Sequence, residues 1–276
     1  MHQIKGVWLL AMAAAVFAMP AAATEWTFPS TNTNVTVTDC GGGATSCKYS
    51  FLSTTGNLTL KVHAFSTASN SSPNSNPSGT WKNANLQNYS GDFGITNLVS
   101  DANECVGCSP EHAVDNDGAY DIMVFELPTG MTWDIEGFRL GWASESGNGV
   151  SADVQTWIGG GQAAIDFTQV CFTGCAKPLV SGTGNLGFKD ITSAMQGVTY
   201  NGGDNNVPEG QTITFAGTQS GRYLVMSGKL GDSKDAFKPE YLKAFGTTIT
   251  QTPLPGTLAL LGLGFAGLVA ARRRPT

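Results

Sequence analysis

Apolar and polar residues alternate through much of this 276-residue chain. The clearest case is residues 58–64, Leu-Thr-Leu-Lys-Val-His-Ala, in which every second side chain is apolar. A period of two places the apolar side chains on one face of a β-strand, which is then half buried. Similar patterns predict further strands at residues 35–38, 120–127, 132–140, 154–158, 165–172, 212–215, 223–230 and 241–250.

Clusters of Gly, Asn, Ser and Pro separate these segments, as turns between strands require. Many short strands spaced in this way predict an all-β fold, an antiparallel β-sandwich or jelly-roll-like domain. Residues 191–195 predict a single helical turn. Residues 70–79 contain two prolines and no large apolar side chain, so they predict a mobile surface loop. We expect one domain over residues 24–252, because no change of composition or long repeat divides this segment.

The N-terminus has the organisation of a secretory signal peptide. Basic residue Lys5 precedes an apolar run at residues 6–19, and Pro20 ends that run. Small side chains at Ala21 and Ala23 provide a cleavage pattern, so we expect residues 1–23 to be removed. A membrane anchor is the alternative, but it needs roughly 20 apolar residues.

The C-terminal 24 residues form a second segment distinct from the domain. Residues 257–271 are apolar and predict a single membrane-spanning helix, slightly short for a bilayer. Three arginines follow it directly and place this end in the cytoplasm by the positive-inside preference. The residues that define this tail are Pro253, Leu254, Pro255, Gly256, Arg272, Arg273 and Arg274.

This tail resembles a PEP-CTERM sorting signal, which combines a Pro-x-Pro motif, a Gly-containing apolar segment and a terminal Arg cluster. Leu254 stands where Glu is typical, so the tail is similar to the Pro-Leu-Pro variant class. The resemblance implies a Gram-negative bacterium and processing by exosortase, a membrane-embedded protease or transpeptidase. It also implies an intermediate anchored in the inner membrane, cleavage near residues 253–256, and then a place at the cell surface or outside the cell.

Two internal stretches resemble motifs of exosortase-dependent surface proteins. The first is His-Ala-x-Asp-Asn-x-Gly-x-x-Asp at residues 112–121, and the second is Gly-Asp-Ser-Lys-Asp-Ala-Phe-Lys at residues 231–238. Proteins of this group are surface components without an established catalytic activity. The resemblance therefore implies a structural or adhesive role.

All six cysteines lie in the exported segment. An even number of cysteines in an oxidising compartment predicts disulfides, and the spacing favours three local pairs. Zinc binding or redox chemistry remains an alternative for the last two of these pairs. The pairs are Cys40 with Cys47, Cys105 with Cys108, and Cys171 with Cys175.

Residues 101–126 contain seven acidic side chains and no Lys or Arg. Carboxylate and amide oxygens are the ligands that Ca²⁺ prefers, and Asp115, Asn116, Asp117 and Asp121 are the candidate ligands. The spacing does not fit an EF-hand. The alternative is a turn in which these side chains bond the backbone without any metal.

The net charge of the exported segment disfavours one class of binding partner. Residues 24–252 carry 11 Lys and Arg against 21 Asp and Glu, a net charge of about −10. This charge argues against nucleic acid, which needs a basic surface.

The sequence lacks a convincing catalytic motif. No Gly-x-Ser-x-Gly segment occurs, and His63 and His112 are the only exported histidines. Residues 182–187 match Gly-x-Gly-x-x-Gly, but no strand–turn–helix unit is expected around them. Asp134 and Glu136 could act as a glycosidase pair, although solvated acids on one strand face are more usual. We expect His63 to be exposed beside Lys61, and we expect no enzyme.

Tryptophans suggest a second possible function. We expect Trp133, Trp142 and Trp157 to pack in the core and Trp26 and Trp81 to lie nearer loops. Exposed tryptophans would instead favour a carbohydrate-binding module, with exopolysaccharide as its partner. The leading hypothesis remains a structural or adhesive surface protein, with a secreted glycosidase as the least favoured alternative.

Overall fold

The computed structural model describes residues 22–28, 35–38, 48–53, 58–67, 80–89, 92–96, 113–116, 119–145, 150–172, 175–180, 185–199, 205–231 and 234–248. Within these ranges no helix is long and apolar enough to cross a membrane. The loop predicted at 70–79 and the tail helix predicted at 257–271 lie outside them.

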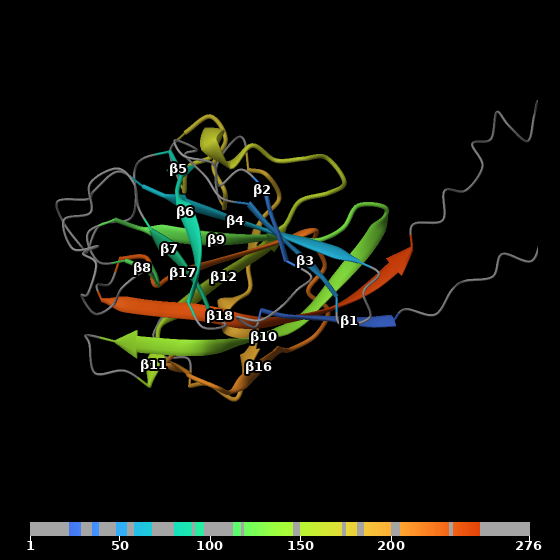
Figure 1. Ribbon diagram of the computed structural model, residues 1–276. Helices are drawn as coiled ribbons and strands as arrows, with labels where there is room; N and C mark the ends of the chain where they lie inside the picture. The colour runs from blue at the N-terminus through green and yellow to red at the C-terminus, as the bar shows by residue number, and fades with distance from the viewer. Residues whose placement is uncertain are drawn as a thin grey trace, which may run out of the picture.

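Two antiparallel sheets form the domain, which confirms the predicted all-β fold (Figure 1). The first, sheet A, has the order β1-β18-β10-β16-β14, with β8 also pairing with β18. Its strands are β1 (Ala22–Thr27), β8 (Val114–Asp115), β10 (Met131–Glu145), β14 (Met195–Gln196), β16 (Thr212–Phe215) and β18 (Asp235–Thr248).

The second, sheet B, has the order β13-β12-β17-β9-β4-β3-β2, with β5 also pairing with β4. Its strands are β2 (Val35–Thr38), β3 (Lys48–Leu52), β4 (Thr59–Ser66), β5 (Lys82–Asn83), β9 (Asp121–Glu126), β12 (Val154–Gly159), β13 (Lys189–Asp190) and β17 (Tyr223–Gly228). Two small ribbons complete the domain, β6 (Asn85–Tyr89) with β7 (Asp92–Thr96) and β11 (Ser151–Ala152) with β15 (Val207–Pro208).

The main hydrophobic core lies between the two sheets. Trp26 and Leu242 of sheet A belong to the same buried cluster as Val62 and Leu224 of sheet B. Phe28, which follows β1, stacks on Phe125 of β9 with 5.8 Å between the ring centroids. The strands alternate as the sequence predicted wherever only one face is covered, as in the eBeB burial of β16.

Sheet B is covered on its outer face as well. The described residues that follow β12 (160–172, 175–180 and 185–191), here called the excursion, lie over this face. They contribute to a second buried cluster that includes Val124, Trp157, Phe167 and Tyr223. Strand β17 is therefore buried at all six positions. The excursion contains the 3₁₀ helix η1 (Phe167–Gln169), so the strand predicted at 165–172 is wrong. Asp166 caps this helix, which competes with strand formation.

The predicted helical turn at 191–195 is confirmed as the 3₁₀ helix η2 (Thr192–Ala194). Trp26 lies within β1, whereas Trp81 directly precedes the two-residue strand β5, nearer a loop as expected. Both are buried, with 0% and 1% exposure, because Trp26 faces sheet B from β1 and Trp81 sits beneath the excursion. Trp133 and Trp157 are buried as expected, whereas Trp142 is only half buried on β10.

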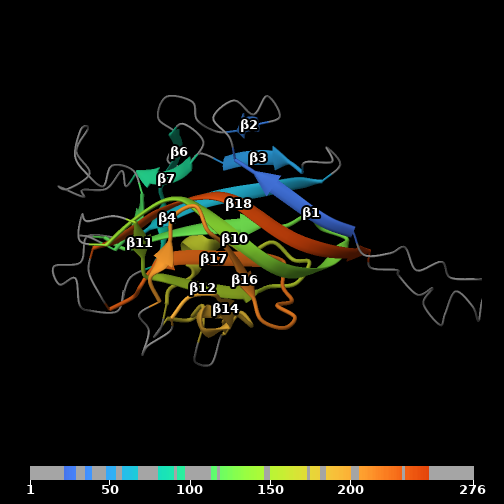
Figure 2. The same ribbon diagram turned by 90° about the horizontal axis from the view of Figure 1, so that it is seen from below.

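Both ends of the domain lie at one pole. Strand β1 begins at Ala22, which pairs with Gly246 near the end of β18. In Figure 1 the start of β1 and the arrowhead of β18 lie together at the right, away from β8 and β11. Figure 2 shows the same arrangement from below. Removal of residues 1–23 would take two residues from β1 and leave the rest of the strand; cleavage at this point remains a prediction.

Candidate functional site

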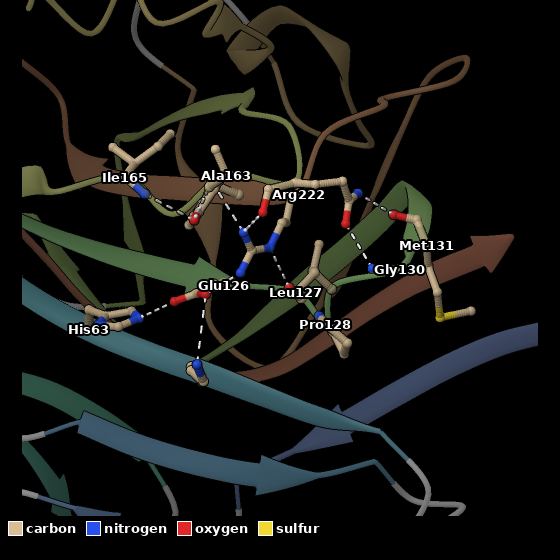
Figure 3. Close-up of polar contacts among 12 residues, drawn as sticks. His63, Glu126, Leu127, Pro128, Gly130, Met131, Ala163, Ile165 and Arg222 are labelled. Atoms are coloured by element: carbon tan, nitrogen blue, oxygen red, sulfur yellow. Dashed lines mark hydrogen bonds and ion pairs between the residues drawn. The ribbon is translucent and has the colours of Figure 1, made fainter. Parts of the chain in front are cut away.

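Glu126, the last residue of β9, is the centre of the most extensive charged cluster among the described residues. It lies in sheet B between Lys61 of β4 and Tyr223 of β17. Its Oε2 is 2.8 Å from Nε2 of His63, and its Oε1 accepts a hydrogen bond from Nη2 of Arg222. The Lys61 ammonium lies 3.9 Å from the same Oε1. Figure 3 shows the carboxylate held between His63 and Arg222.

Arg222 is buried, with 5% exposure, and all three of its guanidinium nitrogens donate hydrogen bonds. Its Nε donates to the carbonyl of Leu127 at 3.1 Å, and its Nη1 donates to those of Gln162 at 2.8 Å and Ala163 at 3.2 Å. The guanidinium also lies over the Tyr223 ring. Arg222 therefore ties the excursion to the sheet, and the remaining nitrogen, Nη2, binds Glu126.

Electrostatics in the cluster favour the ionised carboxylate. The hydrogen bond from His63 lowers the pKa of Glu126 below its ordinary value of 4.5, against the opposing effect of burial, and the nearby cations lower it further. Burial raises the pKa of Tyr223, and the Glu126 charge adds to this effect. The Tyr223 hydroxyl donates to the Ala163 carbonyl at 3.3 Å.

The lowered pKa of Glu126 predicts acid sensitivity. A group whose pKa is lower in the folded state contributes stability above its unfolded pKa and loses it as pH falls through its folded pKa. The free energy of unfolding should therefore fall more steeply below about pH 4.5 in the natural chain than in Glu126→Gln. Urea unfolding from pH 7 to pH 3 measures both slopes, and equal slopes would contradict the role assigned to Glu126.

Two hollows open on either side of Glu126. One, of about 320 Å³, is lined by Lys61, Pro128 and Arg222 among others. The other, of about 380 Å³, lies beneath η1 and is lined by His63, Asn83 and Asp166 among others. Glu126 lines both hollows.

Sequence reasoning placed His63 wrongly and missed Glu126 and Arg222. The His63 side chain is 14% exposed and bonded to Glu126, so it is not a free surface histidine. Glu126 and Arg222 are 96 positions apart and belong to no spacing motif. The one signal was a charged residue at the end of an otherwise apolar strand, repeated by Arg222 immediately before β17.

The structure describes residues 113–116 and 119–126 of the acidic stretch at residues 101–126. Asn116 is 1% exposed and uses its amide within the protein. Its Nδ2 donates to the Lys229 carbonyl at 2.8 Å and to Asp235 Oδ2 at 3.1 Å, while its Oδ1 accepts from the Asp235 amide at 2.9 Å. Asp115 and Asp121 are also buried, and Asp117 lies outside the described residues. No group of three or more acidic, His or Cys side chains is placed to hold a metal ion in the described part of the chain.

These contacts predict that Asn116 stabilises the fold without calcium. Asn116→Ala removes three hydrogen bonds, two of them buried and one partly buried. Each is worth about 1 kcal/mol, so the substitution should lower the free energy of unfolding by about 2–4 kcal/mol. The loss should be the same in calcium and in chelator. Urea unfolding in both conditions measures it, and a loss seen only with calcium would show instead that Asn116 is a calcium ligand.

The cysteine prediction is confirmed for the pair that the structure describes. Cys171 and Cys175 form a disulfide, which closes a loop after η1 and excludes zinc binding by this pair in its oxidised form. Cys40, Cys47, Cys105 and Cys108 lie outside the described residues, and so does His112. Their pairing stays a prediction.

The candidate glycosidase pair, Asp134 and Glu136, and the described part of the Gly-rich segment 182–187 form hydrogen bonds or ion pairs within the protein. Asp134 accepts a hydrogen bond from the backbone amide of Gln219 at 2.6 Å, and Glu136 forms an ion pair with Lys243 at 3.0 Å. In the segment 182–187, Asn185 accepts from the Gly187 amide at 2.6 Å, as in an Asx turn. Strand β13 follows this turn at Lys189, so the context of a dinucleotide site is absent there.

Comparison with known proteins identifies a sorting motif in the C-terminal tail. Residues 251–274 match the family model of the PEP-CTERM protein-sorting motif, and the match contains residues 253–256 and the three arginines. No curated protein matches the chain, and no solved structure matches it. The tail resemblance is thereby confirmed: the chain carries a PEP-CTERM protein-sorting motif, which implies export and sorting by exosortase through a membrane-anchored intermediate to the cell surface.

Proposed function

We propose that the folded domain is a structural or adhesive component of the cell surface or extracellular matrix, associated with biofilm or exopolysaccharide, and that it is not an enzyme. The observation that carries this proposal is the position of β18. This strand ends at Thr248, three residues before the matched sorting motif, so any load on an attachment at the processed C-terminus enters the domain through β18.

Strand β18 is well placed to bear such a load. Its 14 residues extend for about 45 Å, and it lies between β1 and β10 within sheet A. It aligns with β10 at 13 positions and with β1 at six. Hydrogen bonds in antiparallel ladders are perpendicular to the strands, so a pull along β18 loads many of them together in shear.

The charged cluster supports a role without catalysis. The Glu126 carboxylate is engaged by His63, Lys61 and Arg222, and the Arg222 guanidinium bonds three carbonyls in addition. A general base needs a carboxylate that can reach the proton it abstracts. Here Oε2 already binds His63 within sheet B, and Oε1 binds Arg222, which fastens the excursion to the sheet.

A gene-deletion experiment tests the proposed function. We expect deletion to lower the cohesion of the native biofilm several-fold, and the full chain to restore it. A chain that lacks residues 253–276 keeps the complete domain and should be exported without restoring cohesion. Full cohesion in the deletion strain would overturn the structural role, and restoration by the shortened chain would overturn the need for attachment.

A further inference from the structure

The hollow beneath η1, here called the η1 pocket, has the features of a small-ligand site. Its volume of about 380 Å³ is within the range of roughly 300–1,000 Å³ found for small-molecule sites. Its floor is sheet B, at His63 and Phe65 of β4 and at Tyr223 of β17, and its cover is residues 165–168. Asn83 of β5 contributes a further wall.

Polar atoms in this pocket remain available to a ligand. The Asn83 side chain is half buried and bonds no other residue that the structure describes. His63 bonds described residues through Nε2 only, which leaves Nδ1 for a ligand. Asp166 accepts two hydrogen bonds from Thr168 through Oδ1, at 3.0 and 2.5 Å, and its Oδ2 is not used by the described residues.

The framework around these atoms is already in place. His63 is fixed by Glu126 and stacks on Phe65, with 6.3 Å between the ring centroids. Phe167 of η1 packs against Phe65 at 5.5 Å and edge-on against Tyr223 at 5.7 Å. Preorganised groups bind without the cost of ordering them.

Charge and polarity identify the ligand class. The Glu126 charge is offset by Arg222 and Lys61, whereas Asp166 has no ion pair among the described residues, so an anionic ligand is disfavoured. The open atoms include both acceptors and donors, a mixture that suits hydroxyl groups because each hydroxyl can donate and accept. Partly buried Ile165 provides an apolar patch for the C–H groups of such a ligand.

We propose that the η1 pocket binds one unit of a neutral sugar. Asp166 accepts hydroxyl protons, Asn83 donates and accepts, His63 bonds through Nδ1, and Ile165 contacts the sugar ring. Phe65 and Phe167 are 7% and 3% exposed, so they support the pocket wall but offer little surface for stacking. Hydrogen bonds then dominate, and we expect an affinity of about millimolar for a monosaccharide.

The test is saturation-transfer NMR on the purified full chain with the methyl glycosides of glucose, galactose and mannose. We expect at least one to bind and Asn83→Ala to weaken that binding about tenfold or more. Asp166→Asn keeps an acceptor for the η1 cap and should weaken binding as well. Gln196→Ala is the matched control, because it removes an amide from β14 in the other sheet. The variants should unfold at the same temperature as the natural chain.

Several results would overturn this proposal. They are no binding of any neutral glycoside by the folded chain, undiminished binding by Asn83→Ala, or a response to glucosamine or glucuronate alone. The proposal extends the proposed function by naming a ligand, and the two fail separately. If the chain binds no sugar but its deletion still weakens the biofilm, the pocket assignment falls and the surface role stands. If the chain binds sugar but its deletion leaves cohesion intact, the surface role falls and the pocket assignment stands.

Discussion

Replacing Arg222 with Met should lower the free energy of unfolding by about 3–5 kcal/mol. The substitution keeps an unbranched side chain but removes the buried cationic partner of Glu126, whose side chain is only 12% exposed. It also removes the guanidinium donor to the carbonyls of Leu127 and Gln162, and one of the two donors to the carbonyl of Ala163. Urea unfolding followed by tryptophan fluorescence measures the loss.

Lys61→Met is the matched control for this prediction. Lys61 also contacts Glu126, but at 3.9 Å and with its side chain 54% exposed, so its loss should change the free energy of unfolding by less than about 1 kcal/mol. Adding Glu126→Gln to Arg222→Met should recover part of the stability, since the largely buried carboxylate that has lost its guanidinium partner is then neutral. Equal effects of the two single substitutions would mean that the cluster is a surface ion pair.

Trp26→Ala should cost about 3–5 kcal/mol. The side chain has no exposed surface, lies 5.8 Å from the Trp133 ring, and donates from Nε1 to the Leu58 carbonyl at 3.3 Å. It therefore joins the edge strand of sheet A to the start of β4. Urea unfolding followed by circular dichroism measures the loss without relying on the tryptophan signal.

Glu25→Gln is the control on the neighbouring position of β1. Glu25 is partly exposed and lies 3.9 Å from Lys243, so this change should cost less than about 1 kcal/mol. A small effect of Trp26→Ala would mean that β1 is not held in the exported protein. That result would also move the predicted leader cleavage further along the chain, because Trp26 lies three positions after Ala23.

Alternation in the sequence predicted the strands best where one face meets water. It identified β4, β10 and β16, and β16 has the predicted bounds. Strands of two residues, such as β5 and β13, carry too few side chains to show a period. Residues 165–172 alternate in hydrophobicity as a strand does, but they lie over sheet B as an excursion, where the apolar side chains are buried without a strand partner.

The central cluster could not be predicted because its members meet only through sheet pairing. His63, Glu126 and Arg222 come from three segments that the order β17-β9-β4 brings together. No local spacing encodes that order. Residues that act in the tail are consecutive, by contrast, so the sorting motif was recognisable from the sequence and is confirmed by the family match.

The most direct test of the account is the intact mass of the protein recovered from the surface of its native cells, with and without reduction. Exosortase sorting predicts a chain that has lost its leader near Ala23 and its tail from the region of residues 253–256 onward. Reduction should add about 2 Da for each disulfide, and about 6 Da if all six cysteines are paired. A surface protein whose mass still includes Arg272, Arg273 and Arg274 would contradict sorting by cleavage.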